Sequence, residues 1–136
     1  MSFSWPSGTF DSLHPYTRVG NSAVLSSIFF ESMLTGTADE IGASYCLLCA
    51  TMRFPENRDY VIFTLRPEVQ FSDGTPVTSD DVLFSYEILR DEGLPSFRAS
   101  LPMTIESAEI LGPREIKFTF NSNMIISRIW IYSYFW

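Results

Sequence analysis

Residues 71–90 read "FSDGTPVTSDDVLFSYEILR" and place a turn signal directly before a helix start. Asp73 and Gly74 predict a chain reversal, because Gly tolerates positive φ and an Asp side chain can accept a hydrogen bond from the backbone two residues on. Thr78 is of a type that caps helices, since its hydroxyl can accept from the first free amides. The stretch therefore predicts a reversal followed by a helix that begins at about residue 79.

The predicted helix has one apolar side and a defined end. Its apolar residues recur at spacings of three and four, which favours packing against other structure; they are Val82, Leu83, Tyr86 and Leu89. Gly93 and Pro95 then predict its termination. Asp80 and Asp81 resemble a metal site or an acid–base pair, but neighbours on a helix point about 100° apart. A helix start, where carboxylates meet the positive end of the helix dipole, explains both.

The composition favours one folded domain without a role in nucleic-acid binding. The chain has 136 residues, of which 46% are hydrophobic and 15% aromatic, which is enough for one core. The formal charge of -7, with only nine Lys and Arg, argues against phosphate binding, which needs a basic face. The opening "MSFSWPSGTF" lacks the basic and apolar regions of a secretory signal. Either export is absent or a leader has been removed.

Cys46 and Cys49 form a CxxC pattern within the apolar segment "YCLLCATMRF". A zinc site needs two further Cys or His ligands at suitable spacing, and the chain offers only His14. A redox motif normally opens a helix, where the dipole lowers the pKa of a thiol. We therefore interpret the two cysteines as small buried apolar residues and expect no metal and no cofactor.

Two hairpins and one further helix are predicted around the central stretch. From about Ser22, "SAVLSSIFFESML" has apolar residues in a helical rhythm that ends near "TGTADE". The apolar stretch 45–54, the polar reversal "PENRD" and the segment "YVIFTLRP" predict two antiparallel strands. "TIESAEILGPREIKFTF" predicts a second hairpin, which reverses at Gly112 and Pro113. The sum is an α+β fold with a small antiparallel sheet and two main helices.

The last segment, residues 121–136, is strongly apolar and aromatic and ends in "MIISRIWIYSYFW". A membrane span needs about 20 apolar residues, and this run is shorter and is interrupted by Arg128. Exposed, such a segment promotes association. We interpret it as a divergent or truncated tail, in a chain that is interrupted, with a capacity for self-association.

The order of four motifs resembles one protein family. The chain presents "GTFDSLHPYT", "FFESML", "YVIFTLRPEVQFSDGTPVTSDDVLFSYEIL" and "ESAEILGPREIKFTF". This order resembles the amino-terminal part of the extracellular solute-binding proteins of family 5, the oligopeptide and dipeptide receptors of bacterial ABC importers. The resemblance covers roughly residues 7–120. It is strongest to the branch that imports peptides and, in some bacteria, microcin-type peptides.

The resemblance implies part of a two-lobed receptor with a periplasmic-binding-protein type II fold. Such a receptor closes around a peptide and passes it to a membrane permease without chemistry on the ligand. The chain is therefore expected to be periplasmic and not an enzyme. Residues 1–120 are expected to form part of the first lobe, within about a quarter of a complete receptor.

The resemblance also implies candidate ligand-binding residues near the cleft. They are Phe10, Ser12, Leu13, His14, Phe30 and Glu31. The alternative is that Phe10 and Leu13 anchor their loop in the core, because apolar pocket walls and core residues look alike in sequence. A different class of function is a truncated gene product that acts, if at all, as a small interaction module without a role in transport.

Overall fold

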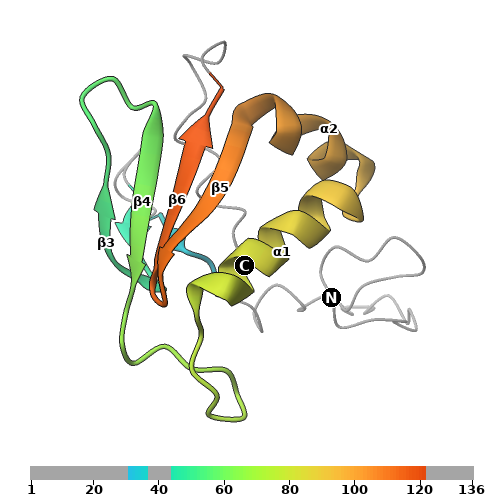
Figure 1. The fold of residues 1–136 in the computed structure, drawn as a ribbon. Coiled ribbons are helices and arrows are strands. Elements are labelled where there is room, and N and C mark those ends of the chain that lie inside the picture. The colour runs from blue at the N-terminus through green and yellow to red at the C-terminus, as the bar shows by residue number, and fades with distance from the viewer. Residues whose placement is uncertain (1–30, 37–43, 122–136) are drawn as a thin grey trace, which may run out of the picture. The chain divides into compact units, whose positions relative to one another are not determined.

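The computed structural model describes residues 31–36 and 44–121, all within one compact unit of the chain. The elements of this part are shown in Figure 1. In chain order they are β1 (Leu34–Thr35), β2 (Tyr45–Cys46), β3 (Cys49–Arg53), β4 (Tyr60–Leu65), α1 (Ser79–Asp91), α2 (Pro95–Thr104), β5 (Ile105–Gly112) and β6 (Glu115–Phe120).

The main sheet has the strand order β3-β4-β6-β5, and all of its neighbours are antiparallel. Both predicted hairpins are present, as β3–β4 and β5–β6. The central pair β4–β6 joins them, with Val61 opposite Phe118 and Phe63 opposite Ile116. The α+β fold class is confirmed.

The turn predicted at Asp73 and Gly74 is present. Gly74 has a φ of 86°, in the region that favours glycine, and its N–H donates to the carbonyl of Phe71 at 2.9 Å. The Thr75 N–H donates to Asp73 Oδ1 at 2.9 Å. Hydrogen bonds from Thr75 hold the pKa of the Asp73 carboxyl below its usual value. The turn therefore owes its shape to one glycine and one carboxylate.

Helix α1 begins where the sequence predicts, at Ser79. The Asp81 carboxylate accepts from the backbone N–H of Thr78 at 2.8 Å and from the Thr78 hydroxyl at 2.7 Å. The bond from the Thr78 N–H is one half of a capping box, and in the other half the Thr78 side chain accepts from the backbone N–H of Asp81. Asp80 is exposed in the first turn. The interpretation of the two carboxylates as helix-start residues is therefore confirmed.

Gly93 and Pro95 predict the end of α1, but the sequence pattern does not predict helix α2, which follows directly. Gly93 follows α1, and a Cβ there would lie 2.3 Å from the carbonyl oxygen of Leu89. Pro95 opens α2 instead of preventing it, since the first helical position needs no N–H donor. One proline thus marks both the end of one helix and the beginning of the next.

The core lies between one face of the main sheet and the two helices, which Figure 1 shows on the β5 side. Alternate residues of β4 and β6 point into it, as a half-buried antiparallel sheet requires. Phe118 is fully buried, with its ring 6.3 Å from that of Phe63 and 5.6 Å from that of Tyr86. Burial raises the pKa of the Tyr86 hydroxyl. The helices contribute Val82, Tyr86, Leu89, Phe97 and Leu101.

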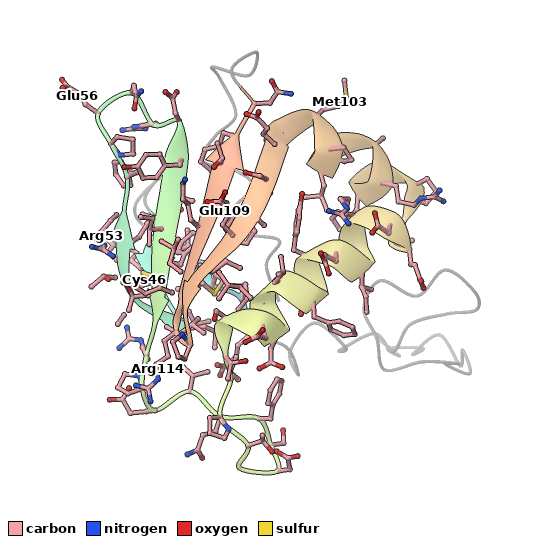
Figure 2. The ribbon with its side chains drawn as sticks, in the orientation of Figure 1. Cys46, Arg53, Glu56, Met103, Glu109 and Arg114 are labelled. Carbon is pink, nitrogen blue, oxygen red and sulfur yellow. A yellow bond between two sulfur atoms is a disulfide. The ribbon has the colours of Figure 1, made fainter. Side chains whose placement is uncertain are left out.

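The opposite face of the sheet carries charged pairs beside the half-buried Tyr60 and Ile62. Arg53 lies 2.7 Å from Glu115, and Lys117 lies 3.3 Å from Glu109; Figure 2 labels Arg53 and Glu109 on β3 and β5. The side chains of Arg53 and Glu115 are 60% and 38% exposed. Such exposed pairs contribute about 0–1 kcal/mol each, so they add little to the stability of the sheet.

Two predictions for the first half of the chain need correction. The predicted first helix falls largely on residues 22–30, outside the described residues, but its expected end is wrong because Leu34–Thr35 is strand β1. The stretch 45–54 is not one strand. Residues Tyr45–Cys46 pair with β1, and only Cys49–Arg53 pairs with β4. The pattern of apolar residues along one segment does not show with which other strand that segment pairs.

Candidate functional site

The predicted ligand-binding residues fall mainly outside the described part of the chain. This holds for Phe10, Ser12, Leu13, His14 and Phe30. Glu31 is described and exposed, three positions before β1. Of the six predicted residues, Glu31 is thus the one with a described setting.

The segment after Glu31 is fixed to the sheet through a short ribbon formed by β1 and β2. Leu34 pairs with Cys46 and Thr35 pairs with Tyr45. The Leu47 N–H donates to the carbonyl of Met33 at 2.9 Å. Met33 and Leu34 are 1% and 3% exposed, so the burial of two large side chains stabilises this attachment.

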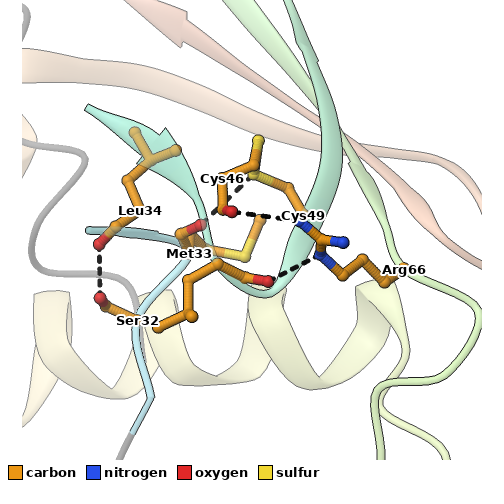
Figure 3. The surroundings of a disulfide bond; sticks show 7 residues. Ser32, Met33, Leu34, Cys46, Cys49 and Arg66 are labelled. Carbon is orange, nitrogen blue, oxygen red and sulfur yellow. Dashed lines mark hydrogen bonds between the residues drawn. A yellow bond between two sulfur atoms is a disulfide. The ribbon is translucent and has the colours of Figure 1, made fainter. Parts of the chain in front are cut away.

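Cys46 and Cys49 form a disulfide, which corrects their interpretation as two free buried apolar residues. Cys49 is fully buried, whereas Cys46 is partly exposed. The Sγ atom of Cys49 lies 3.3 Å from the carbonyl oxygen of Met33. Figure 3 shows this disulfide beside the Met33–Leu34 segment. The CxxC pattern was recognised in the sequence, but an apolar segment gave no sign that the two sulfur atoms meet.

Arg66 holds the turn that the disulfide encloses. Its Nε donates to the carbonyl of Leu47 at 2.9 Å, and its Nη2 donates to the carbonyl of Cys46 at 3.3 Å (Figure 3). Its backbone N–H donates to the carbonyl of Leu48 at 3.0 Å. A permanent positive charge is thereby fixed beside the disulfide.

An open hollow of about 490 Å³ lies between the end of α1 and the start of α2. It is lined by Arg90, Asp91, Pro95, Arg98 and Ala99. The Arg90 guanidinium donates twice to the Asp91 carboxylate, at 2.7 and 2.6 Å. This hydrogen bonding lowers the pKa of Asp91 and raises that of Arg90. Arg90 is paired with Asp91, and the charge of Arg98 also acts on that carboxylate, so the lining does not favour an anion site.

The described residues contain no group of three or more His, Cys, Asp or Glu side chains placed to hold a metal ion. Within the same ranges, no helix has both the length and the apolar character needed to cross a bilayer.

Residues 55–133 match the family described as bacterial extracellular solute-binding proteins, family 5 Middle. The chain belongs to family 5 of the bacterial extracellular solute-binding proteins. The resemblance found in the sequence is thereby confirmed. The matched residues include the turn at Gly74, helix α1 and the β5–β6 hairpin.

Two relatives of this family 5 chain come from Agrobacterium fabrum. The peptidoglycan-binding protein YepA is 34% identical over 122 residues, which are 84% of this chain and 20% of YepA. A protein named probable peptide-binding protein YejA is 36% identical over 115 residues, which are 85% of this chain and 18% of YejA. The chain spans about a fifth of the length of these relatives.

Solved structures of solute-binding proteins share the fold, as expected for a partial periplasmic-binding-protein type II lobe. MoaA from Agrobacterium tumefaciens, in complex with mannopinic acid, gives a TM-score of 0.63 at 21% identity, over 76% of this chain and 21% of MoaA. AgaA, in complex with agropinic acid, gives 0.61 at 29% identity, over 74% of this chain and 20% of AgaA. NikZ from Campylobacter jejuni, in complex with Ni(L-His), gives 0.61 at 20% identity, over 82% of this chain and 20% of NikZ.

Proposed function

We propose that this chain is part of the substrate-binding component of a bacterial ABC importer, and that its ligand is a peptide or a compound that carries one. The observation behind the choice of ligand is the similarity to two proteins whose names state peptidoglycan binding and peptide binding. The fold alone does not select the ligand, since neighbours of the same fold hold an opine or a nickel complex. The ligand is held and released without chemical change, so the chain is not an enzyme.

The proposal places the chain in the periplasm. Disulfides persist in oxidising compartments and are rare in the bacterial cytosol, and the Cys46–Cys49 bond supports that location. The partner in transport is a membrane permease. Residues 1–120 belong to the first lobe of the receptor, and the tail at 121–136 is a route to self-association. Gel filtration of the chain with and without the tail tests that last point, because only a tail-dependent oligomer becomes a monomer on deletion.

The proposed ligand wall is formed by Phe10, Ser12, Leu13, His14, Phe30 and Glu31. Glu31 is the member with a described setting, because it is exposed and directly precedes the segment that β1 and Met33 fix to the sheet. An exposed carboxylate on a fixed segment suits the amino group of a peptide. A hydrogen bond to a charged group contributes about 1.5–3 kcal/mol, so its loss lowers affinity roughly tenfold or more.

Thermal unfolding with a mixture of short peptides tests the proposed ligand class. Ligand present at about 100 times its Kd stabilises a protein by about 2.7 kcal/mol, so a peptide ligand raises the Tm. Mannopinic acid and nickel–histidine serve as the competing ligands. A shift with either competitor and none with peptides refutes the peptide assignment.

A chimeric receptor provides the rest of a two-lobed protein, so that binding can be measured in a complete receptor. In this chimera, the 115 residues of Agrobacterium YejA that match this chain are replaced by the corresponding residues of this chain. The chimera is expected to bind the peptides that YejA binds. Glu31→Gln should then weaken binding, while Glu56→Gln, an equally exposed change in the β3–β4 turn, should not. Equal effects of the two changes contradict the proposed wall.

A further inference from the structure

We propose that the Cys46–Cys49 disulfide is a thiol-exchange site, attacked at Cys46, whose reduction releases the β1–β2 ribbon from the sheet while the rest of the described fold stays intact. The first observation is the unequal burial of the two cysteines. Cys49 is fully buried within β3, and Cys46 is partly exposed at the end of β2. An external thiolate can therefore approach only one of the two residues, and access decides which sulfur is attacked.

The second observation is a hydrogen-bond acceptor beside the buried sulfur. A disulfide sulfur has no proton to donate, yet the Met33 carbonyl oxygen lies 3.3 Å from Cys49 Sγ. After reduction the Cys49 thiol can donate to that oxygen, since S–H is a weak donor. The newly formed thiol thus has an acceptor at hand at the moment of reduction, before the ribbon leaves the sheet.

The third observation is the fixed charge beside Cys46. Arg66 donates to the carbonyl of Cys46 itself and to that of Leu47, the next residue. A neighbouring guanidinium favours the thiolate form of a cysteine. Arg66 therefore stabilises the negative charge on Cys46 when this residue is released, and again when it acts as the nucleophile in reoxidation.

The exchange balances with a dithiol as the reductant. Its thiolate attacks Cys46 Sγ, the S–S bond breaks, and the electron pair goes to Cys49 Sγ, which takes up a proton from the solvent. The second thiol of the reductant loses its proton and attacks the reductant sulfur that is bonded to Cys46. This releases Cys46 as a thiolate. Two electrons pass to the protein, and the reductant ends as a disulfide.

The consequence of reduction is local because of what the disulfide encloses. The closed ring contains only Leu47 and Leu48, so its loss adds little freedom to the unfolded chain. The main sheet and both helices lie outside the ring. What the disulfide constrains is the turn whose Leu47 N–H binds Met33, and therefore the attachment of β1.

Hydrogen exchange of the unmodified chain, with and without dithiothreitol under native conditions, tests the release. Reduction is expected to speed exchange of the Leu47 amide by about tenfold or more, while the Phe118 amide, in the central strand β6, keeps its rate. Equal rates at Leu47 in the two states overturn the inference. Faster exchange at both amides overturns it too, because the disulfide would then hold the whole domain.

Single-cysteine variants test the direction of attack. Cys46 in the Cys49→Ser protein is expected to react with a chromogenic disulfide at least about ten times faster than Cys49 in the Cys46→Ser protein. Adding Arg66→Gln should slow the reaction of Cys46 several-fold, whereas Arg53→Gln, on the exposed face of β3, should not. Equal or reversed rates for the two cysteines contradict the assignment of Cys46.

Discussion

Ser79 joins the start of α1 to the turn between β5 and β6. Its hydroxyl donates to the carbonyl of Gly112 at 2.5 Å, and its backbone N–H donates to the carbonyl of Pro113 at 3.0 Å. The residue is 0% exposed. Because the partners lie on the hairpin and not on the helix, the side chain couples two elements that are far apart in the sequence.

The substitution Ser79→Ala removes one of these two bonds and keeps the other. Loss of a hydrogen bond costs about 0.5–1.5 kcal/mol, and leaving the part-buried Gly112 carbonyl without its donor brings the cost to about 1–3 kcal/mol. The cavity is the size of one oxygen atom and adds little. For a chain of this length about 1 kcal/mol corresponds to about 4 °C, so the expected fall in Tm is roughly 4–12 °C.

Urea and thermal unfolding of the variant measure this loss, with Ser85→Ala as the matched control on the same helix. The Ser85 hydroxyl donates to the carbonyl of Asp81 at 2.8 Å, an oxygen that also belongs to the helix ladder. Its removal should therefore change stability by less than about 0.5 kcal/mol. A similar loss in both variants, or none at Ser79, refutes the coupling of α1 to the hairpin.

Three further perturbations test the turn and the core. Gly74→Ala should destabilise by about 1–2 kcal/mol because of its positive φ, and Gly112→Ala, which meets equally open space, should cost less; similar Tm losses would show that φ is not the cause. Asp73 should titrate by NMR below 3.8 and shift upward in Thr75→Val. Since its folded pKa is lowered, its contribution to stability is present above pH 3.8 and is lost as pH falls through the folded value, and an unshifted titration contradicts this. Phe118→Ala should cost about 3–5 kcal/mol in urea unfolding, and a loss under about 1 kcal/mol would mean that this ring is not central to the core.

The predictions that succeeded concern features set by near neighbours in the chain. The reversal at Gly74 and the start of α1 depend on contacts within a few positions, such as the bond from Thr78 to Asp81. The two hairpins follow from alternating apolar residues on either side of a polar reversal. Helix α2 is not predicted, because a proline such as Pro95 fits both the end of one helix and the first position of the next.

The candidate site was less accessible to sequence reasoning. Ligand-wall residues were proposed from family resemblance, and Glu31 is the one with a described setting. The charged hollow near Arg90 and Arg98 depends on how the ends of two helices approach each other. No pattern within one helix shows such a juxtaposition.

The sequence by itself determined the family, the α+β class, the turn at Gly74 and the amphipathic character of α1, because these follow from local backbone preferences and from apolar spacing. Tertiary structure alone decided the pairing of β1 with β2, the bond between Cys46 and Cys49, and the contact of Ser79 with Gly112. In each of these the chain meets a partner that local pattern does not specify. The choice depends on burying the shared core while satisfying the backbone polar groups at its edge.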